Sequence, residues 1–461
     1  MGDARITQRK IWEVLRNDAW LPPGLQEVKE YLALLAECDE EIVSALELER
    51  GHGRNDYPVR AMWRLMAVCL YLRKARFSDL LGELRRCCDL ARLLGFEEPL
   101  PNQFAIPPDH VVSRFHKKLK QQRYRLLAKE IHEKTVALLR QEDPRIGVHA
   151  AGDATDIRTH GHAARKEGET ETRPATDPEA SWSVKTKRWE DGRGHKREET
   201  KSTFGYKAYL TVDVSQPVVL AEETKTGKTN DQTMAEPMIA ATVKNVGEGV
   251  LESLAMDKGF DSTDTVKAGN ARGVSMLIPV REVAVDLKDQ PTADREKALK
   301  PGGNVVWDSY SGIVACYAKS KDGEMLRREM KHAGFERGRQ CHKFRCPLGE
   351  LAVGSCSAFA TCSAGNSGKL GKQVRVPMET DWRRFASVYP RSKKWERMYN
   401  GRTAVERVNS YLKEVLRLEG HALRGKAAIE LRVTLAAVTL NLRTLLALRR
   451  AKGQAIAAAA A

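Results

Sequence analysis

The sequence contains no run of eighteen uninterrupted apolar residues, which is about the length that a membrane-crossing helix requires. The most apolar segment, 427–448, is interrupted by Glu430, Arg432, Asn441 and Arg443, so we expect a buried core helix there. The first ten residues lack the apolar core of a secretory signal, which indicates a cytoplasmic protein. In that compartment the nine cysteines are expected to stay reduced rather than to form disulfides.

Acidic residues are in deficit, with 61 Asp and Glu against 77 Lys and Arg, which leaves a formal charge of +16. A basic surplus of this size favours polyanionic partners, because each phosphate neutralised by Lys or Arg releases condensed counterions. Binding to nucleic acid is therefore the favoured interpretation, and a merely basic soluble protein is the alternative. The chain of 461 residues is long enough for roughly two to four domains.

Residues 1–142 are expected to form an all-helical domain. Between 57 and 96, apolar side chains recur at three- and four-residue spacing, as in Met62, Leu65, Met66 and Cys69. A further helix from about Asp109 carries basic side chains, namely Arg114, Lys117, Lys118 and Lys120. Short basic helices suit helix-turn-helix contacts with DNA, but a helical bundle with another role has the same pattern.

Residues 143–280 show short apolar runs and helical segments of the kind found in α/β folds. Strands are predicted at 148–157, 204–214, 217–223, 251–256 and 274–280, and helices at 231–246 and about 262–271. This order predicts a mixed sheet with helices on its faces. The hydrophilic stretch at 158–203 is expected to be a solvated loop, which could grip DNA backbone if it lies beside an active site.

The rest of the chain falls into three segments. Residues 281–390 are irregular, rich in Gly and Lys and cysteine-bearing, which predicts a β-rich domain inserted into the α/β core. The helical pattern at 391–452 is expected to complete that core, and the low-complexity tail at 453–461 is expected to fray.

Four cysteines within the expected insertion raise the question of a structural zinc site. They are Cys341, Cys346, Cys356 and Cys362, with four, nine and five residues between successive members. Paired zinc ligands are typically closer in sequence. A Zn²⁺ ion held by four thiolates, with His342 or Cys316 as substitutes, is one interpretation. Unliganded thiols in the inserted domain are the other.

Two aspartates stand where predicted strands end. Asp153 lies near the end of the first strand in GDAT, and Asp257 directly follows the fourth strand in AMDKGFDS. An α/β sheet presents ligands outside the carboxyl ends of its strands, and carboxylate oxygens suit Mg²⁺. Each Asp could instead cap the following turn. Nearby rivals are Asp261, Asp264 and Asp156, the last of which would face the opposite side of the strand from Asp153.

The segment YNGRTAVERVNSYLK, residues 399–413, concentrates polar chemistry on one side of a predicted helix. At about 100° per residue, four side chains project within an arc of roughly 60°: Tyr399, Arg402, Glu406 and Lys413. The opposite side is apolar and is expected to pack on the core through Val405, Val408 and Leu412. Glu406 could bind metal and the two cations could hold phosphate oxygens, whereas the alternative is a solvated face with an Arg402–Glu406 ion pair.

The spacing of Tyr, Arg, Glu and Lys in this segment matches, at every position, the YREK signature of a large group of bacterial insertion-sequence transposases with a DDE active site. Three further segments, GDAT at 152–155, FGYKAYL at 204–210 and AMDKGFDS at 255–262, resemble the first-Asp strand, second strand and second-Asp turn of this family. Residues 57–120 resemble its helical N-terminal region, whereas 281–390 match weakly. Ala154 stands where Gly is frequent in the family.

The resemblance implies a ribonuclease H-like fold, a mixed α/β sheet with helices on both faces, preceded by the all-helical domain and interrupted by the β-rich insertion. It implies that Asp153, Asp257 and Glu406 are catalytic and bind two Mg²⁺ or Mn²⁺ ions. Such an enzyme cleaves the ends of the element and joins the freed 3′-hydroxyl to target DNA.

The resemblance also implies partners. Tyr399, Arg402 and Lys413 would contact the double-stranded DNA of the transposon end. A homodimer on DNA is expected because two ends must be paired, and the place of action would be the bacterial cytoplasm, at the nucleoid, with no membrane partner. Two other functions stay open, a ribonuclease H-like DNA nuclease without strand transfer and a DNA-binding regulator derived from a transposase.

Overall fold

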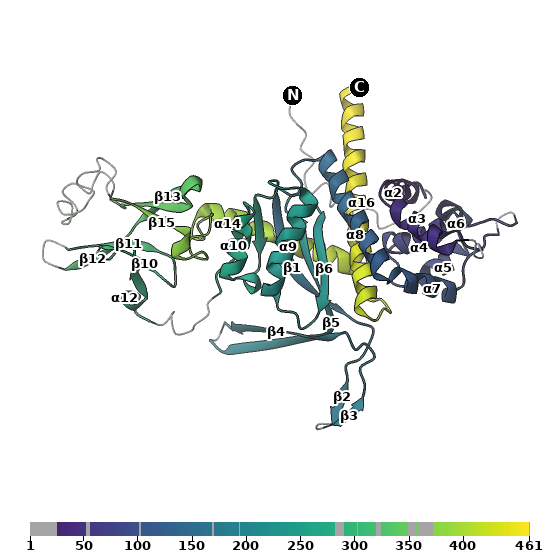
Figure 1. Ribbon diagram of the computed structural model, residues 1–461, viewed down its shortest axis with the longest axis horizontal. Coiled ribbons are helices and arrows are strands. Elements are labelled where there is room, and N and C mark those ends of the chain that lie inside the picture. The colour runs from purple at the N-terminus through teal and green to yellow at the C-terminus, as the bar shows by residue number, and fades with distance from the viewer. Residues whose placement is uncertain are drawn as a thin grey trace. The chain divides into compact units, whose positions relative to one another are not determined.

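The structure is a computed structural model that describes residues 25–51, 56–100, 103–167, 170–192, 194–281, 290–301, 303–319, 324–348, 356 and 372–460. The chain divides into two compact units (Figure 1). Unit 1 combines Met1–Leu251 with Arg402–Ala461, and unit 2 is Glu252–Gly401. Unit 2 therefore begins before residue 281, where the sequence predicted the insertion to start.

Helices build the N-terminal part of unit 1, as the apolar spacing predicted. They are α2 (Gln26–Ala36), α3 (Glu40–Arg50), α4 (Val59–Tyr71), α5 (Phe77–Leu84), α6 (Cys88–Leu94), α7 (Asp109–Leu119) and α8 (Gln122–Glu142). Nearly all side chains of α4 are buried, including Trp63, whose indole N–H donates to Asp39 at 2.8 Å. That bond provides a partner for one oxygen of a buried carboxylate, and Arg60 lies 3.8 Å from the other oxygen.

Antiparallel strands form the sheet of unit 1, with β5 (Lys196–Asp213) between β1 (His149–Arg158) and β6 (Val219–Thr226). In this register Leu210 of β5 is opposite both Asp153 of β1 and Glu222 of β6. Directly opposed residues project from the same face of a sheet, so these three side chains form one row.

Helices cover both faces of this sheet, which confirms the mixed α/β architecture. One face receives α9 (Asp231–Val246), where the hydroxyls of Thr211 and Thr242 lie 2.7 Å apart. The face that carries Glu222 receives α16 (Lys426–Ala460), whose Thr434 donates to the Glu222 carboxylate at 2.7 Å.

The apolar segment at the C-terminal end is the buried core helix that the sequence predicted. Among the described helices, Lys426–Gln454 of α16 alone is long and apolar enough to cross a membrane, yet 94% of its most apolar window is buried inside the protein. Asn441 shows how a polar side chain can be buried on this helix. Its amide accepts from Val219 N at 2.8 Å and donates to Val219 O at 2.9 Å and to Thr135 Oγ1 at 3.0 Å.

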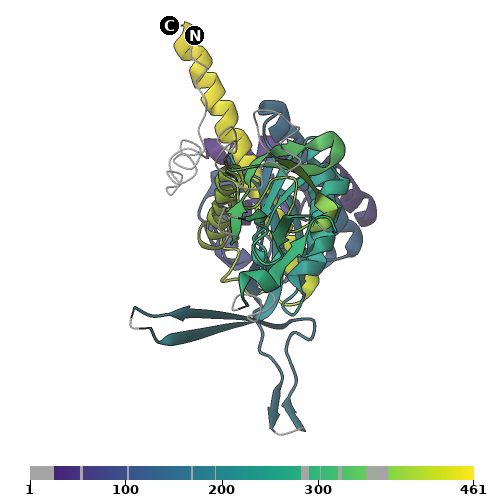
Figure 2. The same cartoon turned by 90° about the vertical axis from the view of Figure 1, so that its left-hand side faces the viewer.

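The stretch at 158–203 is not a solvated loop, and that expectation was wrong. It forms the hairpin β2 (Arg165–Glu167) and β3 (Thr170–Arg173), and a long ribbon in which β4 (Ser181–Glu190) pairs with the first half of β5. Both hairpins project from the sheet (Figure 2). Residues of the ribbon are exposed on both sides, so cross-strand pairs support it, such as Thr186 opposite Thr200 with hydroxyls 3.2 Å apart.

Gly205 stands where β5 passes from the ribbon into the sheet. A Cβ atom at this position would lie 2.1 Å from the backbone oxygen of Ile157 on β1. The neighbouring backbone cannot yield as a flexible side chain can, so the close approach of the two strands requires glycine.

In unit 2, β7 (Ser253–Met256) and β8 (Ser275–Leu277) pair in parallel and are connected through η1 (Lys258–Phe260) and α10 (Thr263–Ala271). A four-stranded sheet follows, with β9 (Glu296–Ala298), β10 (Val305–Asp308), β11 (Val314–Lys319) and β12 (Met325–Glu329), and the short helix α12 (Thr292–Arg295) precedes it. A three-stranded sheet comes next, with β13 (Lys331–Glu336), β14 (Cys341–Arg345) and β15 (Gln373–Pro377). These seven strands, β9 to β15, lie within 281–390, the segment for which the sequence predicted β-structure.

An aromatic core joins these two sheets inside unit 2. Its buried members include Trp307, Phe344, Phe385 and Tyr389. Trp307 meets Phe385 edge-on with ring centroids 5.5 Å apart. The segment ends with α14 (Lys393–Tyr399), capped by Ser392.

Candidate active site

Asp153 lies in the middle of β1 and is half-buried. Its Oδ1 accepts the backbone N–H of Ala154 at 2.8 Å. The side chain shares a sheet face with Leu210 and Glu222, and this is the face opposite α9. The β1 strand therefore presents one carboxylate on this side of the sheet.

Asp156 faces the other way, as the strand period predicted, because it lies opposite Lys207. It forms an ion pair with Lys185 of β4 at 2.9 Å. Burial raises the pKa of Asp156, but the contacts with Lys185 and Ser183 more than offset burial and hold the pKa below its ordinary value. Asp156 is thus engaged in attaching the ribbon to β1, which leaves Asp153 as the stronger candidate.

Glu406 lies on α15 (Thr403–Ser410), which packs against β1 and β5. Val405 and Val408 are buried in that contact, as expected, whereas 54% of the Glu406 side chain is exposed. Arg402 forms an ion pair with Glu406, so the expected four-residue pair is present. The packing brings a helix with one carboxylate onto the strand with another.

The segment 399–413 is not one regular α-helix, which corrects the assumption of 100° per residue. The 3₁₀-helix η6 (Asn400–Arg402) precedes α15, and the π-helix η7 (Tyr411–Val415) follows it. Tyr399 belongs to unit 2, where its ring stacks on Trp395 at 4.6 Å.

Lys413 lies in the π-helix and connects it to β1. Its ammonium group donates to the backbone oxygen of Asp156 at 2.6 Å and forms an ion pair with Glu419 at 3.0 Å. Leu412 beside it is fully buried, as predicted. Because π-turns insert an extra residue into the hydrogen-bond ladder, Lys413 takes a direction that the α-helical period does not predict.

Asp257 directly follows β7 in unit 2 and caps η1, since its Oδ1 accepts the backbone N–H of Lys258 at 2.8 Å. Its rival Asp261 is buried and forms an ion pair with Arg383. Asp261 also accepts the backbone N–H of Arg281 at 2.5 Å, so its carboxylate has a structural role. Asp264 lies in the first turn of α10.

The three candidate carboxylates are divided between the units, with Asp153 and Glu406 in unit 1 and Asp257 in unit 2. Within the part of the chain that the structure describes, no group of three or more His, Cys, Asp or Glu side chains is placed to hold a metal ion.

The cysteine cluster is described only in part, because Cys362 lies outside the described residues. Cys341 is buried and donates from Sγ to Glu336 at 3.6 Å. Both ring nitrogens of His342, the possible substitute ligand, have protein contacts: one lies 2.8 Å from the Ala386 carbonyl and the other 3.0 Å from His332. The described cysteines are free thiols.

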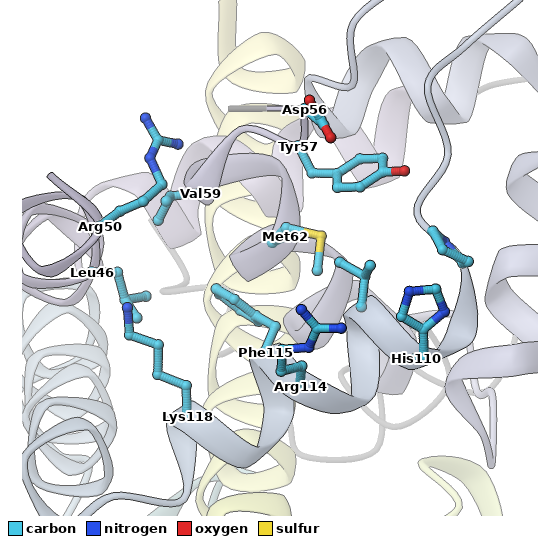
Figure 3. A pocket seen from close by; sticks show the side chains of 12 residues that line it. Leu46, Arg50, Asp56, Tyr57, Val59, Met62, His110, Arg114, Phe115 and Lys118 are labelled. Carbon is cyan, nitrogen blue, oxygen red and sulfur yellow. The ribbon is translucent and has the colours of Figure 1, made fainter. Parts of the chain in front are cut away.

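Basic helix α7 borders two cavities of unit 1, and sequence reasoning did not predict either. One has a volume of about 510 Å³ and lies between α3, α4 and α7 (Figure 3). Arg114 and Lys118 line it together with Arg50, and Lys118 forms an ion pair with Glu49 at 3.2 Å. The other cavity lies on the opposite side of α7. The sequence feature that could have indicated these cavities is the run of basic residues in α7.

Together these features define a basic α/β protein with carboxylates on a sheet strand and on a helix packed against it, the class to which phosphoryl-transfer enzymes of nucleic acids belong. Residues 146–442 match the family model of the transposase DDE domain. This match covers more than half of the chain, so the chain belongs to that family, whose members act in DNA transposition and recombination.

Among solved structures, the chain is similar to a cryo-EM structure of a piggyBac transposase synaptic complex with hairpin DNA, at 11% identity and a TM-score of 0.29. That similarity covers 88% of this chain and 78% of the other. No curated protein matches the chain.

Proposed function

We propose that this protein cuts DNA at the ends of a mobile element and joins the freed 3′-hydroxyl to target DNA. Asp153, Asp257 and Glu406 are the proposed catalytic residues. The family match is the observation that carries the proposal. The packing of α15 on β1 supports it, because Glu406 and Asp153 come from these two elements.

A ribonuclease H-like catalytic core is part of the proposal. Three antiparallel strands, β1, β5 and β6, are followed by α9 and then by the parallel pair β7 and β8 around α10. This order of elements supports such a core, with the β-rich segment inserted before α15.

Divalent ions fit the donors that the two elements of unit 1 offer. Carboxylates are the hard oxygen ligands that Mg²⁺ and Mn²⁺ prefer, and Mg²⁺ needs few of them because it retains waters. When bound, two such ions would activate the attacking oxygen and stabilise the leaving oxygen of the phosphodiester. Exposure of the Glu406 carboxylate keeps it accessible, and Arg402 holds its orientation through their ion pair.

Basic and aromatic side chains near the carboxylates would position the substrate. We assign Tyr399, Arg402 and Lys413 to contacts with the transposon-end DNA, following the YREK group of bacterial insertion-sequence transposases. Arg402 offers a planar donor for phosphate oxygens, whereas Lys413 would act through its charge from a position anchored to β1. The proposed assembly is a homodimer on double-stranded DNA at the nucleoid, since two ends must be paired.

A cleavage and joining assay with Mg²⁺ tests this function. The substrate is a labelled duplex that carries the terminal sequence flanking the gene, with an unlabelled target plasmid. We expect joined products from the wild-type protein. Asp153→Asn, Asp257→Asn and Glu406→Gln should each lower the cleavage rate roughly a thousandfold or more while DNA binding persists.

Matched controls separate chemistry from general damage. Asp264→Asn and Glu414→Gln make the same changes at exposed positions on α10 and in η7 and should retain activity. Binding without cleavage would identify a regulator, and cleavage without joining a nuclease, and either result contradicts the proposal. Full activity of any of the three variants would refute its assignment.

A further inference from the structure

The second cavity beside α7 has a volume of about 580 Å³ and lies wholly within unit 1. It is lined by α5, α7, the loop at 422–424 and the beginning of α16. Among the described residues that line it, Asp109 is the only acidic one, against five cationic ones: Arg76, Lys117, Lys120, Arg424 and Arg432. Charge of one sign therefore dominates the walls.

None of these five cations forms an ion pair with a carboxylate within the described ranges. By contrast, Lys118 of α7, which lines the other cavity, is paired with Glu49 at 3.2 Å. Lys117 and Arg76 are exposed, and water can solvate them. One of the five cations is buried, so water cannot solvate it as it solvates Lys117 and Arg76.

Arg432 is that cation, with only 6% of the residue exposed. Its Nη2 donates to the backbone oxygen of Arg417, but its Nε is buried and has no hydrogen-bond partner among the residues described. Burial lowers the pKa of Arg432, as expected for a guanidinium that has lost water without gaining a counter-charge. A buried charge of this kind is costly unless an anion pairs with it.

Two imidazoles add donor capacity around Arg432. His116 lines the cavity, and burial, followed by the charges of Lys120 and Arg432, lowers its pKa to about 4. His421 precedes the lining loop, and burial, followed by the Arg432 charge, lowers its pKa to about 4 as well. Nε2 of His421 is buried without a partner among the described side chains. The site is therefore built from groups that bind an oxyanion.

We infer that this cavity binds a phosphate group and, resting on the proposed function, that the group belongs to the DNA backbone. The loop at 422–424 is attached to the end of β1, because His160 N donates to Leu423 O at 3.1 Å and Arg424 Nε donates to His160 O at 2.6 Å. A strand rises about 3.3 Å per residue, so Asp153 and His160 are separated by at most about 23 Å. The cavity is thus a second phosphate contact, several nucleotides from the proposed site of cleavage.

Thermal unfolding of the full-length protein with inorganic phosphate tests the site without DNA or catalysis. We expect phosphate to raise the Tm by several degrees above NaCl of equal ionic strength, because a ligand that binds the folded state stabilises it. The double variant Lys117→Ala/Lys120→Ala should lose this rise. The matched double variant Arg85→Ala/Arg86→Ala removes two exposed cations outside the cavity, at the end of α5, and should keep it.

Arg432→Met separates a ligand-binding role from a structural one. A buried charge without a counter-ion is replaced by an apolar side chain of similar length, so the Tm without phosphate should be unchanged or higher. The phosphate-induced rise should disappear. A lower Tm together with a preserved rise would show that Arg432 only supports the Arg417 loop and would overturn the inference.

Binding of a labelled duplex of about twenty base pairs identifies the source of the phosphate. If the DNA backbone occupies the cavity, Lys117→Ala/Lys120→Ala should reduce the slope of log affinity against log salt by about one to two, and the control pair by less. An unchanged slope with a lost phosphate-induced rise would assign the site to free phosphate or a nucleotide and would overturn the DNA part. No phosphate response in the wild-type protein would overturn the site itself, whereas failure of cleavage alone would overturn only the proposed function.

Discussion

Glu222 shows at the scale of one residue how the sheet of unit 1 accommodates a buried carboxyl group. Burial raises its pKa to about 8, although Lys129 and the hydrogen bond from Thr434 act in the opposite direction. Its neighbour Glu223 pairs with Lys129 at 2.7 Å and with Lys225 at 3.0 Å. Burial raises the pKa of Glu223 as well, but these two lysines more than offset it and lower the pKa overall. Two adjacent carboxylates thus respond to pH in opposite senses.

Glu222→Gln should reduce the pH dependence of stability. Between the ordinary value of 4.5 and about 8, the folded state keeps a proton that the unfolded chain has released. Stability therefore falls as pH rises through this window, by up to about 1.4 kcal/mol per pH unit. Urea unfolding at pH 5, 6.5 and 8 measures the free energy of unfolding of both proteins. The value for the variant should increase relative to that of the wild type as pH rises.

Glu223→Gln provides the contrasting variant, because a lowered pKa contributes stability above the ordinary value and loses it as pH falls. It should be less stable than the wild type at pH 7, and the difference should shrink toward pH 4. If both variants shift in the same direction with pH, the assignment of a protonated Glu222 is wrong.

The candidate site could be predicted from the sequence only as far as local pattern reaches. Asp257 stands out because it directly follows an apolar strand, whereas Asp153 was expected near the end of its strand and lies in the middle of β1. Their rivals form ion pairs, Asp156 with Lys185 and Asp261 with Arg383. These partners are distant in sequence, so residue spacing could not predict the pairs. The basic cavity was missed for the same reason, because its walls come from segments far apart in the chain.

At the scale of elements, helices and strands were predicted correctly where burial of one face gives the apolar residues a regular spacing. The helix predicted at 231–246 has these same bounds, and the strand predicted at 148–157 is shifted by one residue. The β4–β5 ribbon was missed because it is exposed on both sides and shows no apolar alternation. The π-helix was missed because buried positions three and four residues apart, such as Val405, Val408 and Leu412, fit either helix type.

Asn441→Leu should weaken the attachment of α16 to β6. The Asn441 amide satisfies both backbone groups of Val219 and also bonds to Thr135, all of them buried. Leucine would leave the Val219 N–H without its acceptor, whereas His132 still contacts Val219 O at 2.9 Å and Thr135 still donates to His132 O. We expect a loss of roughly 1–3 kcal/mol in the free energy of unfolding. Chemical denaturation measures this loss.

Asn270→Leu on α10 is the matched control, because its side chain forms no hydrogen bond with the described residues and is half-buried. It should change stability by less than about 0.5 kcal/mol. Equal losses in both variants would mean that the bridge between α16 and β6 contributes little.

At the scale of the whole molecule, the charge of +16 is distributed unevenly between paired and unpaired cations. Arg449 and Arg450 on α16 pair with Glu37, which follows α2, and with Glu30 on α2, so part of the basic surplus holds unit 1 together. The cations of the 580 Å³ cavity have no such carboxylate partner among the described residues. The surplus available to a polyanion is therefore smaller than the net charge but locally concentrated.

This distribution predicts a steep salt dependence of DNA binding by the intact protein. If about six to ten phosphates are contacted, affinity for a duplex should fall roughly 10³- to 10⁵-fold between 50 and 200 mM salt, because released counterions are bound again. Fluorescence anisotropy over that range, at constant pH and without Mg²⁺, gives the slope. The carboxylates proposed to bind metal do not contribute to this term, so Asp153→Asn should have the same slope as the wild type. A slope near zero would mean that the basic surplus serves internal ion pairs alone, and DNA would then have to be recognised without its backbone charge.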